Sequence, residues 1–480
     1  MKKLPSLSAT SWLTTKTVFS QVFAILLFAI QAPVLGPRAF GLISIVLVFV
    51  GFCELVLGEA SAEALISIRE IDDAHFDTMN TVICALSLVF GLLVFFGAHV
   101  AARLFGDPEF VPLLHWMAIL PVVSAMGSVP QAATKRAMEF QPLALRSILS
   151  LVVGGVVGLI LTLSHYGAWA LAWQALVTRL VSTVVLWMAI PLKFRFGFSR
   201  SRLTDLAKFA LPTLLSRLMS WATAQFPRLV FGLYWGPTEL GLFGLASRLC
   251  DILVEVGLMP RYVVARLELR RFASDPAGLA DALCEALSNT TVILFPLCIG
   301  GAAVAPTLFH AWLDARWVGG IVPAEMLILM CAPFVTHFLA GAALLAMNFQ
   351  AAEAVVSIAQ TLLTLAVVFV FGPFGINIAT AAFAARPLLL MPLPIMLLKK
   401  KCAISPSKLL RAQRPAFIAA CTMGVVVTGL RVGLEPMLSS VILLPILMMV
   451  GAAIYASMIA VMLPQMTARY LKASPFSRPR

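Results

Sequence analysis

A seven-residue pattern occurs twice in this chain of 480 residues, and the two copies lie 200 positions apart. The first copy is Gly36-Pro37-Arg38-Ala39-Phe40-Gly41-Leu42, and the second is Gly236-Pro237-Thr238-Glu239-Leu240-Gly241-Leu242. Each copy joins two long apolar stretches, and Gly and Pro interrupt helices and favour tight turns. We therefore expect a turn at the membrane surface at each copy. The repeat predicts two similar helical bundles, an organisation typical of transporters.

The composition places the chain in a membrane. Hydrophobic residues make up 61% of it and charged residues only 12%, too few to give a soluble globule a polar surface. Apolar stretches of about 20 residues, the length that crosses the hydrocarbon core as a helix, recur from Val18 almost to the C-terminus. We predict an all-α, polytopic membrane protein of about fourteen transmembrane helices. The expected spans are 14–35, 40–66, 77–100, 112–133, 147–164, 168–191, 208–234, 240–264, 286–309, 322–347, 354–372, 375–398, 415–433 and 439–463.

The basic residues indicate the orientation in the membrane. A net charge of +13 is also common in nucleic-acid-binding proteins, but here Lys and Arg gather in alternate loops. Cytoplasmic loops of membrane proteins carry this excess of positive charge. We therefore predict a multi-pass protein of the bacterial inner membrane with both termini in the cytoplasm, which contacts membrane lipids and no nucleic acid.

The repeat also predicts the domains. An even number of helices in each copy gives both copies the same orientation, with a cavity between two pseudo-symmetric six-helix lobes. A C-terminal helix pair has no counterpart in the first half. The expected segments are an N-terminal six-helix lobe (1–192), a cytoplasmic basic linker (193–207), a C-terminal six-helix lobe (208–398), a cytoplasmic basic loop (399–414), an appended helix pair (415–463) and a cytoplasmic basic tail (464–480).

Four arginines predicted deep in the membrane are candidate substrate-binding residues. Each charge at mid-membrane costs about 2.5–3.5 kcal/mol on insertion scales, so it must face protein or water. The guanidinium group matches a phosphate bidentately, which suits the headgroup of a lipid diphosphate. The alternative is salt bridging between helices, for example to Glu54 or Asp251. The candidates for a cationic cavity are Arg179, Arg217, Arg248 and Arg386.

Four further residues are candidates for ion coupling or salt bridges: Glu54, Asp251, Glu255 and His337. Arg248, Asp251 and Glu255 follow one another at helical spacing, so neutralisation among them is an equally good interpretation. His337 lies near the middle of its expected span. It is a candidate proton relay, although a lone histidine on an apolar face is more often a packing residue.

We expect no enzyme activity, metal site or cofactor. The chain has no Gly-rich phosphate loop ending in Lys-Ser/Thr and no Ser/His/Asp arrangement, which disfavours an ATP-driven pump. Its eight cysteines form no metal-type cluster, and none lies clearly in an outside loop. The sequence therefore also predicts no disulfide.

Several segments together resemble a known family. They are Leu35-Gly36-Pro37 through Phe40-Gly41-Leu42, Gly58 with Ala64-Leu65-Ile66, Val129-Pro130 followed by Lys135-Arg136 and Glu139-Phe140, Gly167-Ala168-Trp169-Ala170-Leu171, the second Gly-Pro copy, and Gly241-Leu242 to Arg248-Leu249. Over about the first 400 residues, this combination resembles the Wzx-type polysaccharide flippases of the multidrug/oligosaccharidyl-lipid/polysaccharide exporter superfamily.

The resemblance implies a specific activity. A flippase of this type moves undecaprenyl-diphosphate-linked oligosaccharides across the inner membrane by alternating access, for exopolysaccharide or lipopolysaccharide O-antigen biosynthesis. Its substrate is the lipid-linked oligosaccharide, and polysaccharide polymerase and export proteins are its implied partners. Where the family commonly has an Asp in the seventh helix, this chain reads Gln225-Phe226-Pro227-Arg228. That departure makes a potential-driven uniport more plausible than ion coupling through this position.

Two other classes remain open from the sequence. A multidrug or cation exporter of the same superfamily requires acidic residues to prevail in the cavity. This alternative stays open because the chain has four acidic candidates: Glu54, Glu59, Asp251 and Glu255. A membrane-embedded polysaccharide ligase or polymerase requires large outside loops with catalytic acids. The expected outside loops are short, which disfavours the enzyme.

Overall fold

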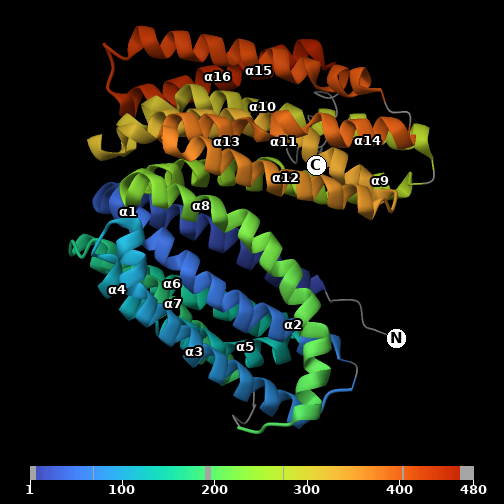
Figure 1. Ribbon diagram of the computed structural model, residues 1–480. Helices are drawn as coiled ribbons and strands as arrows, with labels where there is room; N and C mark the ends of the chain where they lie inside the picture. Colours follow the sequence, from blue (N-terminus) through green and yellow to red (C-terminus); the bar gives the residue numbers. More distant parts are fainter. Residues whose placement is uncertain (1–6, 69, 190–195, 274, 403–404, 465–480) are drawn as a thin grey trace, which may run out of the picture. The chain divides into compact units, whose positions relative to one another are not determined.

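The computed structural model describes residues 7–68, 70–189, 196–273, 275–402 and 405–464 (Figure 1). These residues form helices joined by short turns, and none of them lies in a strand. The predicted all-α, polytopic fold is confirmed. Contacts divide the chain into two compact units, Met1–Gly241 (unit 1) and Leu242–Arg480 (unit 2).

Unit 1 is a bundle built largely around α1, α5, α6 and α7. Helix α6 packs against α7 and α1, and α5 packs against α3 and α7. A single turn of π-helix, Leu55–Glu59, follows directly after Glu54 and joins α1 to α2. The helices are α1 (Leu7–Glu54), α2 (Ala60–Ser67), α3 (Asp73–Phe105), α4 (Phe110–Met117), α5 (Leu120–Arg136), α6 (Phe140–Leu163), α7 (Ala168–Ala189) and α8 (Arg200–Gly257), of which α8 continues into unit 2.

Unit 2 contains the remaining helices. Helix α10 packs against α11 and against the C-terminal pair α15 and α16, which therefore belongs to this unit. The helices are α9 (Met259–Arg271), α10 (Pro276–Trp312), α11 (Ile321–Ala346), α12 (Gln350–Phe371), α13 (Ile376–Leu390), α14 (Pro392–Cys402), α15 (Pro406–Leu434) and α16 (Ser440–Met462).

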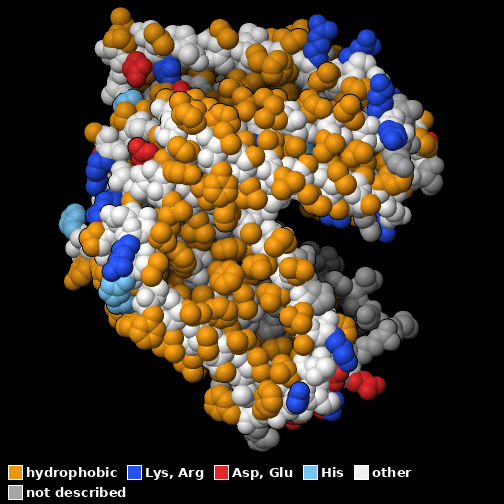
Figure 2. Space-filling view, viewed as in Figure 1, with side chains coloured by type: hydrophobic (Ala, Val, Ile, Leu, Met, Phe, Trp, Pro, Cys, Tyr) orange, Lys and Arg blue, Asp and Glu red, His pale blue; other side chains and the backbone are white. Residues whose placement is uncertain are grey.

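Most of the expected membrane spans fall on long apolar helices of the structure. Eleven segments of the described chain are long and apolar enough to cross a membrane. One of them, Lys16–Gly58, overlaps two of the expected spans. The two expected over residues 208–264 fall mainly on α8, which is not among the eleven, so the number of about fourteen spans stays a prediction. Figure 2 shows hydrophobic side chains over most of the visible face of each unit, with charged side chains gathered toward the helix ends. This distribution fits a lipid-facing surface bounded by polar headgroups.

Both copies of the repeated pattern adopt the same local conformation. Gly36 has φ 74° and ψ 170° and interrupts α1, and Gly236 has φ 75° and ψ −179° and interrupts α8. Positive φ is readily available to glycine and disfavoured for other residues. The predicted breaks between helices are therefore confirmed at both copies.

The two copies also pack against each other through their second glycines. A Cβ atom placed on Gly41 would overlap the carbonyl oxygen of Pro237, and one on Gly241 would overlap the carbonyl oxygen of Pro37. The contact is reciprocal because each copy supplies both a glycine and a proline carbonyl. Only a residue without a side chain permits backbones to approach this closely.

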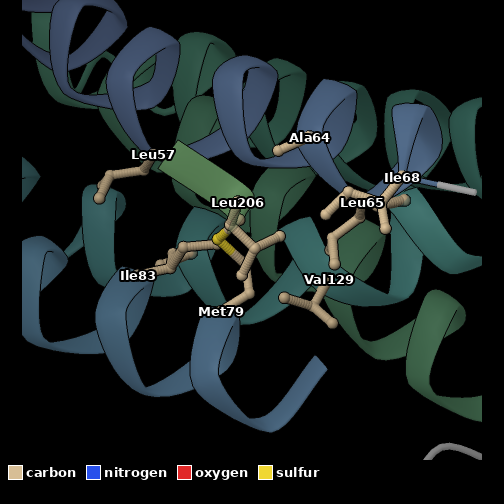
Figure 3. Close-up of a cluster of buried hydrophobic side chains, with 10 residues drawn as sticks. Leu57, Ala64, Leu65, Ile68, Met79, Ile83, Val129 and Leu206 are labelled. Carbon is tan, nitrogen blue, oxygen red and sulfur yellow. The ribbon is translucent and has the colours of Figure 1, made fainter. Parts of the chain in front are cut away.

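A buried apolar cluster fixes the beginning of α8 within unit 1 (Figure 3). Leu206 of α8 is 1% exposed and packs with Leu65 of α2, Met79 and Ile83 of α3, and Val129 of α5. The start of α8 thus belongs to unit 1, and the boundary between the units lies at Gly241 rather than in the 193–207 segment, of which residues 193–195 lie outside the described chain. The six-helix lobes stay a prediction from the repeat.

The expectation of no disulfide is wrong. Cys250 of α8 and Cys331 of α11 form a disulfide in unit 2, although 81 positions separate them in the sequence. A disulfide was expected only between cysteines of outside loops, whereas this pair lies within helices. Only the packing of unit 2 shows that the two thiols are neighbours.

Candidate functional site

A cavity of about 410 Å³ lies within unit 1, between α1, α5, α6, α7 and α8. Its wall includes hydroxyl and amide groups from Ser124, Ser128, Gln131, Ser182 and Thr183. Four basic side chains and one carboxylate also line it: Lys135, Arg146, Arg179, Arg217 and Glu54. The charged groups of this cavity are therefore predominantly positive. We call it the cationic cavity.

Arg179 and Glu54 form an ion pair across the cationic cavity. Nη2 of Arg179 lies 2.5 Å from Oε2 of Glu54, while the hydroxyl of Ser124 donates to Oε1 at 2.6 Å. This is the salt bridging between helices that the sequence left as an alternative for Arg179. The Arg179 side chain nevertheless remains 46% exposed, so its guanidinium has room for a second acceptor. The pair joins α1 to α7 and holds Arg179 at the cavity wall.

Arg146 is a charged lining residue that the sequence analysis missed. It lies on α6, where its Nη1 donates to the amide oxygen of Gln131 at 2.9 Å. Its Nε is buried and has no hydrogen-bond partner within the described part of the chain. The expected span began at residue 147 and so placed Arg146 in a loop, whereas α6 begins at Phe140. Pro142, a residue type tolerated in the first turn of a helix, was the signal for this earlier start.

Two further elements contribute positive charge around the cavity. Arg217 and Trp221 lie one turn apart on α8 and line the same wall. Lys16 of α1 lies close enough to Arg146 and Lys135 for electrostatic repulsion. Like charges gathered in a membrane protein repel one another unless an anion or water stabilises them. The arrangement is suited to hold an anion with several oxygen acceptors.

The other two candidate arginines belong to unit 2. On α13, Arg386 donates from Nη1 to the Thr364 hydroxyl and from Nε to the carbonyl oxygen of Phe383, at 2.7 Å for the latter. Its guanidinium also lies over the Phe383 ring, 3.3 Å from the centroid. These contacts, from its own helix and from α12, provide partners for Arg386 without a substrate.

Arg248, Asp251 and Glu255 lie in one stretch of α8 that belongs to unit 2. Asp251 and Glu255 are exposed on α8, one and two turns after Arg248. Neutralisation among the three groups stays a prediction.

His337 is buried on α11, with 7% of its surface exposed. The Phe334 ring lies 6.1 Å away in a stacked arrangement, and Gln360 interacts with the imidazole. Its Nδ1 has no hydrogen-bond partner among the described residues. These contacts are those of a packing residue, and the proton relay stays a prediction.

The sequence of this chain is similar to a known protein family and to individual known proteins. A family model described as polysaccharide biosynthesis protein matches residues 9–322. The succinoglycan biosynthesis transport protein ExoT of Rhizobium meliloti is 27% identical over 316 residues, which are 64% of each chain. The lipopolysaccharide biosynthesis protein WzxC of Escherichia coli is 20% identical over 332 residues, 67% of this chain and 66% of that one. The match thus spans about two thirds of these relatives' length.

Solved structures show the same fold. The lipid II flippase MurJ, in an inward closed conformation, has a TM-score of 0.75 at 14% identity, covering 94% of this chain and 99% of that chain. An inward-facing multidrug resistance transporter of the MATE family, in the MOP superfamily, has a TM-score of 0.59 at 15% identity, covering 80% and 94%. At these identities the similarity is one of fold.

Proposed function

Since this chain belongs to the polysaccharide biosynthesis protein family, we propose that it is a flippase that moves undecaprenyl-diphosphate-linked oligosaccharides across the bacterial inner membrane. Transport by alternating access would serve exopolysaccharide or lipopolysaccharide O-antigen biosynthesis. The observation that carries the proposal is the cationic cavity, in which Lys135, Arg146, Arg179 and Arg217 oppose the single carboxylate of Glu54. A fold shared with MurJ is consistent with a transporter rather than an enzyme.

The chemistry of the cavity fits the diphosphate linkage of such a substrate. Arginine offers five donors in a planar fork and binds phosphate oxygens bidentately, and a guanidinium remains charged at any physiological pH. The Nε of Arg146 has no partner among the described residues, and part of the Arg179 side chain is exposed. Both guanidinium groups can therefore donate hydrogen bonds to a phosphate while Arg146 keeps its bond to Gln131 and Arg179 its ion pair with Glu54. The serine, threonine and glutamine groups of the wall can bind sugar hydroxyls. In this proposal Arg248 and Arg386 add positive charge along the path in unit 2.

The same cavity disfavours the cation exporter. A site for organic cations requires negative charge to prevail, because a buried cation must be paired. Four basic residues and one carboxylate give the opposite balance, and the carboxylate already pairs with Arg179. Of the other acidic candidates, Asp251 and Glu255 do not line this cavity.

Deletion of the gene tests the proposed function. We expect a loss of surface polysaccharide and accumulation of the lipid-linked oligosaccharide on the cytoplasmic leaflet, because synthesis continues while translocation stops. Extraction of lipid-linked sugars, with glycosidase access to everted and right-side-out vesicles, measures the amount and the leaflet. Equal amounts in both leaflets of the deletion strain would show that another protein performs this step.

Reporter fusions at each end test the predicted cytoplasmic termini.

Glu54→Gln tests competition between Glu54 and the substrate for Arg179. The amide keeps an oxygen for the Ser124 hydroxyl but removes the negative charge that pairs with Arg179. A partly exposed ion pair contributes about 1 kcal/mol or less, so we expect undecaprenyl diphosphate to bind up to about fivefold more tightly. Calorimetry with the protein in nanodiscs measures the change, and Ser124→Ala, which preserves the charge, is the control. Weaker binding by Glu54→Gln would mean that Glu54 does not compete with the anion.

A further inference from the structure

A second cavity, of about 450 Å³, lies in unit 2 between α9 and α11. Arg266 and Arg270 of α9 line one side, together with Tyr262. Apolar side chains of both helices, among them Leu267 and Leu345, form most of the rest of the wall, together with Asn348. The cavity therefore combines two positive charges with a hydrocarbon surface. We call it the α9–α11 pocket.

The two arginines of the α9–α11 pocket are available to a ligand. They lie four residues apart on α9 and so occupy one face of the helix. None of the ion pairs among the described residues includes either of them. The guanidinium of Arg266 lies 6.0 Å from the centre of the Tyr262 ring, which orients it without neutralising it. Glu268, two residues from each arginine, does not line the pocket.

The pocket opens where helices end. Arg270 is the penultimate residue of α9, and Asn348 of the pocket wall lies just after the last residue of α11. Asn348 has φ 60°, the left-handed conformation with which helices often terminate. The ends of spanning helices lie at the depth of lipid headgroups. The charged side of the pocket is thus expected at the headgroups and the apolar side toward the acyl chains.

We propose that the α9–α11 pocket binds the phosphate headgroup of an anionic membrane phospholipid. Basic pockets between transmembrane helices are known binding sites for such headgroups. A small free anion would contact the arginines but would leave the apolar wall unused, whereas a phospholipid fills both parts. The site is separate in the sequence from the cationic cavity and involves none of its residues. It would stabilise unit 2 in membranes rich in anionic lipid.

Neighbouring arginines of α9 provide the test and its control. Arg270 lines the pocket, whereas Arg271 is exposed and does not, so Arg270→Gln and Arg271→Gln remove the same charge one residue apart. We expect Arg270→Gln to weaken binding of phosphatidylglycerol by about fivefold, since each basic residue near an anionic headgroup contributes about that factor. Native mass spectrometry of the full chain, titrated with phosphatidylglycerol and phosphatidylcholine, measures the affinity. Arg271→Gln should bind like the unaltered protein.

A second variant separates a shaped pocket from general surface attraction. Ala346→Leu keeps every charge but places a larger side chain in the pocket, so it should also weaken phosphatidylglycerol binding. Equal effects of Arg270→Gln and Arg271→Gln, with none from Ala346→Leu, would overturn the proposal in favour of nonspecific attraction. Displacement of the lipid by millimolar inorganic phosphate would equally overturn it, because it would identify a small-anion site. Neither outcome depends on transport activity.

Discussion

Replacing Arg146, Arg179 and Arg217 together with Gln is expected to reduce export of the polysaccharide about 100-fold or more. A hydrogen bond to a charged group contributes about 1.5–3 kcal/mol, and this variant removes three groups that can make such bonds to a diphosphate. All three line the cationic cavity from different helices, α6, α7 and α8, so their effects should combine at one bound anion. Surface polysaccharide in the deletion strain, complemented with each variant, measures the result.

The matched control removes the same charge elsewhere. Arg200, Arg411 and Arg414 are exposed and do not line the cavity, so their triple replacement with Gln should leave export nearly unchanged. A melting curve of the purified variant distinguishes loss of binding from loss of folding. Normal export by a stably folded cavity variant would reject the role of these arginines. It would leave the family assignment intact, since that depends on the sequence match over residues 9–322.

Gly41→Ala and Gly241→Ala are each expected to destabilise the protein by about 1–3 kcal/mol or more, the usual cost of overpacking. The added methyl group would overlap a main-chain carbonyl, of Pro237 in one case and of Pro37 in the other. A carbonyl cannot rotate away as a flexible side chain can, so the repeated turns must separate. We expect the melting temperature of the purified protein in detergent to fall by about 1–3 °C or more.

Gly244→Ala is the control for this pair of variants. Gly244 lies three residues after Gly241 on α8, and a Cβ atom there would meet nothing within 4 Å. Alanine is also the better helix former, so this change should be neutral or slightly stabilising. If Gly41→Ala and Gly241→Ala melt like Gly244→Ala, the close approach of the two repeats does not contribute to stability. If only one of the two is destabilised, the contact is not reciprocal.

Arg179 and Arg146 differ in how well their positions within the apolar spans predict that they line the cavity. Arg179 lies far from both ends of a clear apolar span. The free energy needed to insert a charge at that depth identifies it as a candidate site residue. Arg146 was not predicted to line the cavity because its helix begins several residues earlier than the apolar stretch does. Helix ends are the least certain part of a sequence prediction. Likewise, the spacing of Arg248, Asp251 and Glu255 places them on one stretch of α8, while pairing among them stays a prediction.

The amino-acid sequence by itself determined the membrane location, the all-α fold and the repeated breaks at Gly36 and Gly236, because these depend on local composition and backbone freedom. Only the tertiary structure decided which charges meet. It joined Glu54 to Arg179 across 125 positions, added Arg146 to the cationic cavity, and brought Cys250 to Cys331. Such contacts depend on how distant helices pack, and helical periodicity specifies a face of a helix without specifying the helix that covers it.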